Sequence, residues 1–226
     1  MSYVITSDGT QIHRKATDIA SVTVLGTGVL GSQIAYQSAY SGFDVTAYDI
    51  SDEILKGAEH RFAGIAASYE LEVDGAAGGR AQDALARIVY SSDLAEAVQD
   101  ADLVVEAVPE RLDLKREVYT KLAKTAPAKT IFATNSSTLM PSAMADFTGR
   151  PERFLALHFA DPVWSSKIAE VMGHPRTDSS VYRAVVGFAR RIATYKRLFL
   201  LTYDPERVRR IFADGPSVQM VVAGKA

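Results

Sequence analysis

The 226-residue sequence contains no cysteine. Its absence excludes disulfide bonds, thiolate metal sites and a cysteine nucleophile, and it fits a reducing compartment. The sequence also lacks an apolar run of the roughly 18 residues that a membrane span needs. Residues 1–18 contain no apolar core of signal-peptide length. From these absences we expect a cytoplasmic protein.

Neither sign of charge is in large excess. The chain has 25 basic and 27 acidic residues, which gives a formal net charge of −2. The charges are intermixed, so the sequence offers no basic surface for nucleic acid or for an anionic membrane. The hydrophobic content of 47% is ordinary for a globular protein. We therefore expect a globular chain whose partner is a small molecule.

A glycine-rich segment near the start of the chain is its most informative feature. The sequence VTVLGTGVLG at residues 22–31 begins as a buried strand and continues into three spaced glycines. Gly26 permits a tight turn, Gly28 lets the backbone approach a pyrophosphate, and Gly31 lets the next helix pack closely on the strand. This pattern predicts a dinucleotide site. The loop residues expected to contact the cofactor are Gly26, Thr27, Gly28, Val29, Leu30 and Gly31.

An acidic residue, Asp49, closes the same unit. It follows a helical pattern that ends near Gly42 and an alternating strand pattern at residues 45–48. A carboxylate at this position accepts a ribose 2′-hydroxyl and repels the 2′-phosphate of NADP. No arginine follows until Arg61, so we expect the cofactor to be NAD. A tight turn in an unrelated α/β domain is the alternative interpretation.

Strand and helix patterns continue to alternate along the chain. Such alternation is typical of a parallel sheet covered by helices on both faces. We expect an α/β fold of the Rossmann type, with a doubly wound and mostly parallel sheet. Further strands are expected at residues 88–90, 103–108, 130–134, 154–159 and 168–172, helices at 52–70, 92–99, 112–126 and 141–146, and a connecting loop at 74–79.

Polar side chains lie at the ends of several of these strands, where ligands of such sheets bind. Glu110 follows one strand, Ser136 and Ser137 follow another, and His158 and Glu170 lie in the last two. A histidine can take a proton from an alcohol near neutral pH, and a neighbouring carboxylate fixes its tautomer. A packed histidine, helix-capping serines and a surface ion pair are the alternatives.

Four sequence blocks, in this order, resemble the NAD-binding domain of the L-3-hydroxyacyl-CoA dehydrogenase family. The blocks are VLGTGVLGSQIA, DADLVVEAVPERLDLK, IFATNSSTL, and RFLALHFADP followed by EVM. They span residues 20–172, and their order and separation argue against chance. The resemblance implies catalytic roles for Ser137, His158 and Glu170. It also implies that Glu110 and Lys115 contact the nicotinamide cofactor.

The reaction implied by the resemblance is oxidation of an L-3-hydroxyacyl-CoA to a 3-oxoacyl-CoA, in fatty-acid or butanoate metabolism. His158 would remove the hydroxyl proton, Glu170 would orient His158, and Ser137 would hydrogen-bond the oxygen. An acyl-CoA is the expected partner, and no metal is expected. The family is dimeric through a helical domain, which the sequence does not show.

Three positions differ from the family pattern or are not assigned by it. Asp161, counted among the expected cofactor contacts, stands where the family has asparagine, so it would bring a negative charge near the cofactor. Lys56 and Arg61 are interpreted as solvated surface charges, with a CoA phosphate as the alternative partner.

We expect three segments: an N-terminal extension at residues 1–19, the NAD-binding domain at 20–192, and a divergent tail at 193–226. The tail could add a strand at 197–202 and a helix at 205–212 to a minimal domain. A disrupted gene, with loss of the helical domain, is the favoured explanation. Two alternatives for the function remain: a catalytically silent NAD-binding fragment, and a Rossmann dehydrogenase that acts on a hydroxy acid without CoA.

Overall fold

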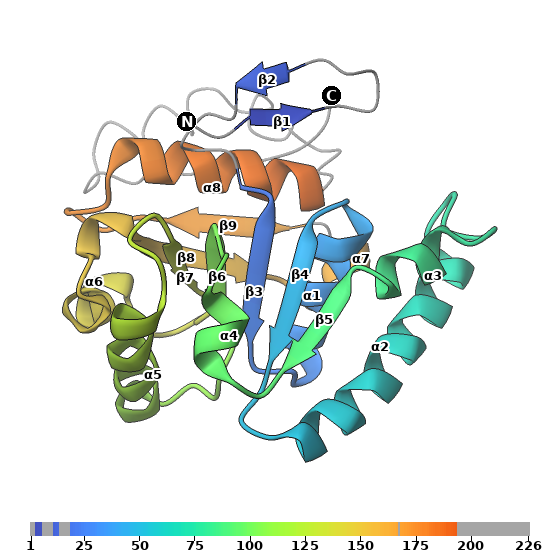
Figure 1. Cartoon of the computed structure of the whole chain (residues 1–226), viewed down its shortest axis with the longest axis horizontal. Helices are drawn as coiled ribbons and strands as arrows, with labels where there is room; N and C mark the ends of the chain where they lie inside the picture. The colour runs from blue at the N-terminus through green and yellow to red at the C-terminus, as the bar shows by residue number, and fades with distance from the viewer. Residues whose placement is uncertain (1–2, 6–10, 14–18, 167, 194–226) are drawn as a thin grey trace, which may run out of the picture.

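The computed structural model describes residues 3–5, 11–13, 19–166 and 168–193. Seven strands form one sheet in the order β5-β4-β3-β6-β7-β8-β9 (Figure 1). Neighbouring strands from β5 to β8 are parallel, and β9 is antiparallel to β8. The strands are β3 (Ser21–Leu25), β4 (Asp44–Tyr48), β5 (Ile88–Ser91), β6 (Leu103–Glu106), β7 (Ile131–Thr134), β8 (Phe154–Phe159) and β9 (Ala169–Met172).

Helices cover both faces of this sheet. One layer packs on a core that includes Val22, Ile34 and Phe188, and the other on a core that includes Val104 and Tyr119. The first layer contains α1 (Val29–Tyr40), α2 (Asp52–Glu72), α3 (Arg80–Leu85), α7 (Val163–Ser166) and α8 (Ser179–Ile192). The second contains α4 (Leu94–Val98), α5 (Leu112–Thr125), α6 (Pro141–Met144) and the 3₁₀ helix η1 (Ala145–Thr148).

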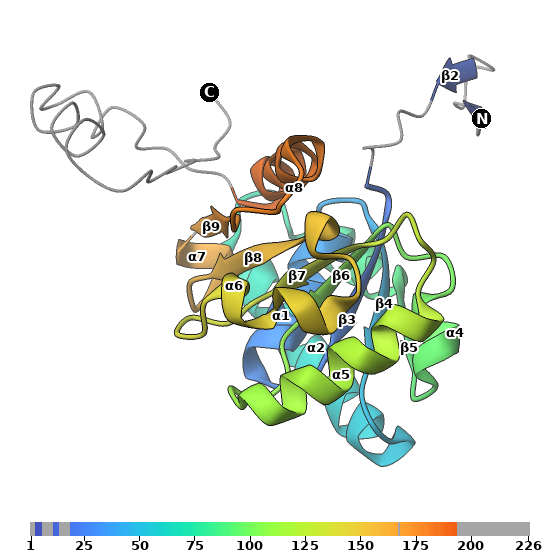
Figure 2. The same ribbon diagram turned by 90° about the vertical axis from the view of Figure 1, so that its left-hand side faces the viewer.

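The arrangement confirms the expected doubly wound α/β fold. Figure 2 shows α5 and α8 on opposite sides of the sheet. A second 3₁₀ helix, η2 (Pro151–Arg153), leads into β8. Two short strands, β1 (Tyr3–Ile5) and β2 (Gln11–His13), pair antiparallel with each other. No helix in the described part of the chain combines the length and apolar character needed to cross a bilayer.

Three α-helices, α3, α7 and α8, were not predicted from the sequence. α3 follows the expected loop, and Gly79 precedes it with φ +106°. α8 begins after Asp178, whose carboxylate accepts a hydrogen bond from Ser180 N at 2.6 Å. The buried residues of α8 recur at helical spacing, so this helix had a readable signal: an N-cap followed by an apolar stripe. The stripe consists of Val181, Val185, Phe188, Ala189 and Ile192.

The strand expected at residues 103–108 ends two residues early, at Glu106. Val108 N donates to the Glu106 side chain at 2.9 Å and so turns away from the strand ladder. The tail elements expected at residues 197–202 and 205–212 lie outside the described residues.

We predict that α8 contributes substantially to the stability of the domain. Phe188 is 2% exposed, and its ring lies 4.8 Å from that of Phe43. Phe188→Ala should lower the free energy of unfolding by about 3–5 kcal/mol, because the substitution leaves a cavity under the helix. Arg190→Ala, on the exposed side of the same helix, should change it by less than about 0.5 kcal/mol. Urea unfolding measures both values; equal effects would contradict the prediction.

Candidate active site

The turn between β3 and α1 is built on two glycines that no other residue could replace without movement of the backbone. Gly26 has φ +94°, and a Cβ there would lie 2.9 Å from the Ala107 carbonyl oxygen. A Cβ at Gly31 would lie 1.9 Å from the Gly26 carbonyl oxygen. A Cβ at Gly28 would meet nothing within 4 Å, so the space beside this residue is open. The expected tight turn, close helix packing and open approach at Gly28 are all present.

Asp49 is fixed against this turn. Thr27 N and Thr27 Oγ1 each donate to Asp49 Oδ2 at 2.7 Å, and Ile50 N donates to Oδ1 at 2.8 Å. The parallel pairing of β3 with β4 brings the end of each strand to the same edge of the sheet. A residue 22 positions after Thr27 in the sequence therefore becomes its hydrogen-bond partner.

Two cavities meet at the glycine-rich turn. One, of about 240 Å³, lies between the turn and the ends of β7 and β8. The other, of about 570 Å³, lies between Asp49 and helix α5. Both are lined by Gly28, Ala107 and Val108, so together they form an extended space with the turn at its middle. This shape suits a dinucleotide whose pyrophosphate lies at the start of α1.

The smaller cavity gathers most of the polar residues predicted from the sequence. It is lined by Glu110, Lys115, Ser137 and His158, and also by Asn135. These residues come from the ends of β6, β7 and β8 and from α5. Asn135 Oδ1 accepts a hydrogen bond from Phe159 N at 3.0 Å, and so fixes the backbone next to His158. The sequence offered a signal for Asn135, since it directly follows a buried strand.

Glu170 contacts His158 across the last pair of strands. The antiparallel register places the two residues directly opposite each other. His158 Nδ1 lies 2.8 Å from Glu170 Oε2. With Nδ1 as the donor, the carboxylate fixes the ring so that Nε2 carries the lone pair. The structure therefore brings together the His158, Glu170 and Ser137 of the sequence prediction, because Ser137 lines the same cavity as His158.

Lys115 is held by a buried carboxylate that was not predicted from the sequence. Lys115 is 1% exposed, and its Nζ lies 2.6 Å from Glu106 Oε1. Glu106 is fully buried in β6 and also accepts hydrogen bonds from Tyr119 OH (3.2 Å) and Thr134 Oγ1 (2.8 Å). Its charge is compensated by these donors, as a buried carboxylate requires. Glu106 lies within an apolar run of the sequence, so its role as the partner of Lys115 was not predicted.

Glu110 connects Lys115 to the loop that follows β7. Lys115 Nζ lies 3.3 Å from Glu110 Oε2, while Ser136 Oγ and Thr138 donate to Oε1. Desolvation raises the pKa of Glu110, but the hydrogen bonds from Ser136 and Thr138 and the Lys115 charge outweigh it. The net effect lowers the pKa to about 2. Glu110 is therefore ionised at neutral pH and orders the loop that carries Ser137.

Asp161 lies outside the two cavities. Its Oδ1 accepts a hydrogen bond from Gln33 Nε2 at 2.9 Å, and Gln33 Oε1 accepts one from Val163 N at 2.9 Å. The peptide bond between Asp161 and Pro162 is cis. Gln33 thus links helix α1 to the turn after β8. A direct contact between Asp161 and a cofactor stays a prediction.

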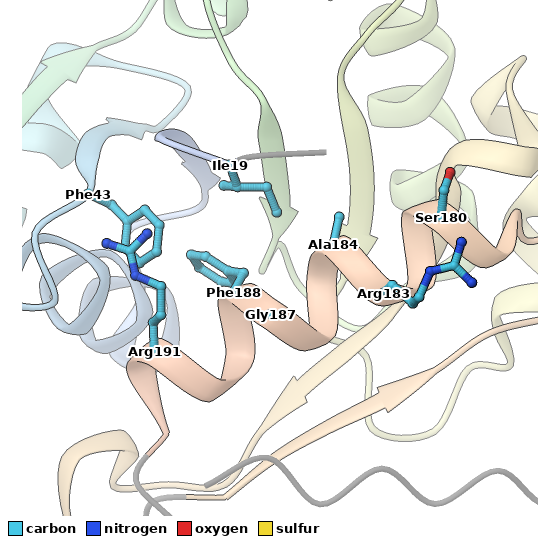
Figure 3. Close-up of a pocket in the computed structure, with 8 residues that line it drawn as sticks. All are labelled: Ile19, Phe43, Ser180, Arg183, Ala184, Gly187, Phe188 and Arg191. Carbon is cyan, nitrogen blue, oxygen red and sulfur yellow. The ribbon is translucent and has the colours of Figure 1, made fainter. Parts of the chain in front are cut away.

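Another cavity, of about 500 Å³, lies along α8 near the amino ends of β3 and β4 (Figure 3). Arg191 lies over the Phe43 ring there, at 4.1 Å. This cavity includes none of the residues at the carboxyl ends of the strands, so it is separate from the candidate site.

Within the described part of the chain, no group of three or more histidine and acidic side chains could hold a metal ion.

The model of the 3-hydroxyacyl-CoA dehydrogenase NAD-binding domain matches residues 21–196. The chain belongs to this family. It carries the NAD-binding domain, and the open approach at Gly28 and the carboxylate of Asp49 fit NAD. The match agrees with the resemblance inferred from the four sequence blocks.

Individual relatives include enzymes with and without CoA in their names. Human mitochondrial hydroxyacyl-coenzyme A dehydrogenase is 34% identical over 86% of this chain and 63% of its own length. L-carnitine dehydrogenase from Pseudomonas sp is 33% identical over 76% of this chain and 52% of its own length. The chain thus spans less than two thirds of the length of these relatives.

Solved structures give the same fold. A diketoreductase is 64% identical with a TM-score of 0.77, over 77% of this chain and 62% of its own. The 3-hydroxybutyryl-CoA dehydrogenase from Escherichia coli K12 is 30% identical with a TM-score of 0.72, over 77% of this chain and 37% of its own.

The glycines of the turn should respond differently to a methyl group. Gly31→Ala should lower the free energy of unfolding by about 3 kcal/mol, because its Cβ would clash with backbone rather than with a flexible side chain. Gly28→Ala should keep the fold but weaken NADH binding by about tenfold or more, because the methyl group fills the approach to the pyrophosphate. Urea unfolding and NADH fluorescence titrations measure the two effects; full NADH affinity in Gly28→Ala would refute this assignment.

The buried pair of Glu106 and Lys115 should behave as a coupled unit. Glu106→Gln or Lys115→Met alone should lower the free energy of unfolding by about 3–5 kcal/mol, since each removes the buried charge that compensates the other. The double variant should lose less free energy of unfolding than the sum of the two single losses. Urea unfolding of the four proteins gives the coupling energy, and strictly additive losses would show that the two charges are independent.

Proposed function

We propose that this chain contains the cofactor site and the proton-transferring residues of an NAD-dependent dehydrogenase that interconverts a 3-hydroxyacyl and a 3-oxoacyl group. The observation that carries the proposal is the His158–Glu170 pair, which lies beside Ser137 at a cavity that opens onto the glycine-rich turn. Oxidation of an alcohol by a nicotinamide cofactor requires a group that takes the hydroxyl proton and, next to it, a site that binds the cofactor.

Each residue of the pair has a distinct part in proton transfer. His158 Nε2 accepts the proton of the substrate hydroxyl group, because Nδ1 is directed to Glu170. Glu170 orients the ring and stabilises the imidazolium that forms. Ser137 donates a hydrogen bond to the substrate oxygen and so limits the orientations in which the substrate binds.

Backbone groups and charged side chains form the proposed cofactor site. NAD supplies the hydride-accepting chemistry when it is bound. The backbone at Gly28 and the start of α1 would hold the pyrophosphate, and Asp49 would hold the adenosine ribose. Lys115 and Glu110 line the smaller cavity, where they would hold the nicotinamide half.

An L-3-hydroxyacyl-CoA is the first candidate substrate, since it is the substrate class of the family. A carbonyl compound without CoA is the second. The diketoreductase is 64% identical to this chain, whereas the human CoA dehydrogenase is 34% identical, so the second candidate is tested beside the first. The third candidate is NAD binding without turnover.

Removal of the proposed base should abolish turnover without loss of cofactor binding. His158→Ala should reduce kcat/KM for acetoacetyl-CoA reduction by about 10²–10⁴-fold, the usual contribution of a general acid–base group. The dissociation constant for NADH should stay unchanged. His60→Gln, on the exposed surface of α2, provides the matched control and should keep full activity.

Initial rates of NADH oxidation and parallel NADH titrations distinguish the outcomes. Turnover that is equal in the wild type and in His158→Ala would refute the proposal. NADH binding by a wild-type chain that turns over neither acetoacetyl-CoA nor pentane-2,4-dione would establish the silent domain. Turnover of the diketone alone would assign the substrate class without CoA.

A further inference from the structure

Arg61 is exposed, as expected of a surface charge, and it also contacts the glycine-rich turn. It lies in the third turn of α2, and its Nε donates to the Thr27 carbonyl oxygen at 3.0 Å. The same oxygen accepts a hydrogen bond from Ser32 Oγ at 2.8 Å. Arg61, on α2, and Ser32, on α1, therefore both help to fix the turn through the same carbonyl oxygen.

Arg61 and Asp49 hold the same residue from two sides. Thr27 donates to Asp49 through its N–H and hydroxyl groups, and it accepts from Arg61 through its carbonyl group. Both charged residues line the larger cavity. The guanidinium and the carboxylate thus lie at the same end of that cavity, next to the turn. Across the described ranges, no carboxylate forms an ion pair with Arg61.

This arrangement has opposite consequences for the two nicotinamide cofactors. A carboxylate that receives the ribose hydroxyl groups repels a 2′-phosphate at the same place. A guanidinium is always charged and binds phosphate oxygens through paired N–H groups. Since Arg61 uses only its Nε on Thr27, its two terminal nitrogens can reach a further ligand.

We propose that Arg61 is a specificity-determining residue of the cofactor site: with Asp49 it forms a phosphate subsite that the Asp49 charge keeps closed to NADPH. This inference rests on the proposed position of the adenosine ribose beside Asp49. Arg61 supplies the cation that a 2′-phosphate needs. The negative charge of Asp49 alone prevents the 2′-phosphate of NADPH from binding there. Neutralisation of Asp49 should therefore be enough to admit NADPH.

The test compares NADH and NADPH binding by fluorescence titration in four variants of the full chain. Asp49→Asn keeps an oxygen that can accept both hydrogen bonds from Thr27, but it removes the charge and the acceptor for Ile50 N. It should increase NADPH affinity by about tenfold or more and weaken NADH binding. Asp49→Asn combined with Arg61→Gln should lose the gain in NADPH affinity. Asp49→Asn combined with Lys56→Gln is the matched control, because Lys56 is an exposed cation of the same helix that lines neither cavity; it should keep the gain.

Arg61→Gln alone is the fourth variant and should leave NADPH binding as weak as in the wild type. Thermal melting of each variant confirms that it is folded before titration. No gain of NADPH affinity in Asp49→Asn, or a gain that survives the loss of Arg61, would overturn the inference while leaving the proposed function intact. Failure of the wild type to bind NADH, or an unchanged NADH affinity in Asp49→Asn, would instead refute the proposed cofactor placement.

Discussion

The backbone contact between Gly31 and Gly26 is the constraint on which the site depends. The first residues of α1 can approach the end of β3 this closely only because neither glycine carries a side chain. This approach directs the free N–H groups at the start of α1 toward the cavity and leaves the space beside Gly28 open. The ends of β6, β7 and β8 reach the same edge because these strands run parallel to β3. A looser turn would displace the helix from every other residue of the site.

Charge is distributed unequally around this turn. On one side, the buried Glu106 holds Lys115, and Lys115 reaches Glu110 and the loop after β7. On the other side, Thr27 connects Asp49 to Arg61. In the first group, Glu106 and Lys115 are buried and fix each other by compensated charge, whereas Glu110 is exposed. The second group borders the larger cavity. With the proposed cofactor placement, this division would let one glycine-rich turn serve two chemically different halves of a dinucleotide.

Much of the fold could be predicted from local patterns. The apolar strands, the glycine spacing and the acid after β4 report directly on short segments, so the order of strands and helices was readable. The helix α8 was missed although Asp178 and the apolar stripe that follows it carry the ordinary signal. The roles of Glu106 and Arg61 could not be predicted, because an acid within a buried strand and an arginine on a polar helix face acquire partners only from distant elements.

The sequence by itself determined the turn at Gly26 and Gly28, the strand that ends near Glu106, and the residue types available for proton transfer. These depend on backbone conformation and on side-chain chemistry, which are local properties. Only the tertiary structure decided which groups meet. The antiparallel register of β8 and β9 sets His158 opposite Glu170, and the packing of α2 beside the turn brings Arg61 to Thr27. Contacts of this kind depend on the pairing and packing of separate elements, so no local pattern in the sequence specifies them.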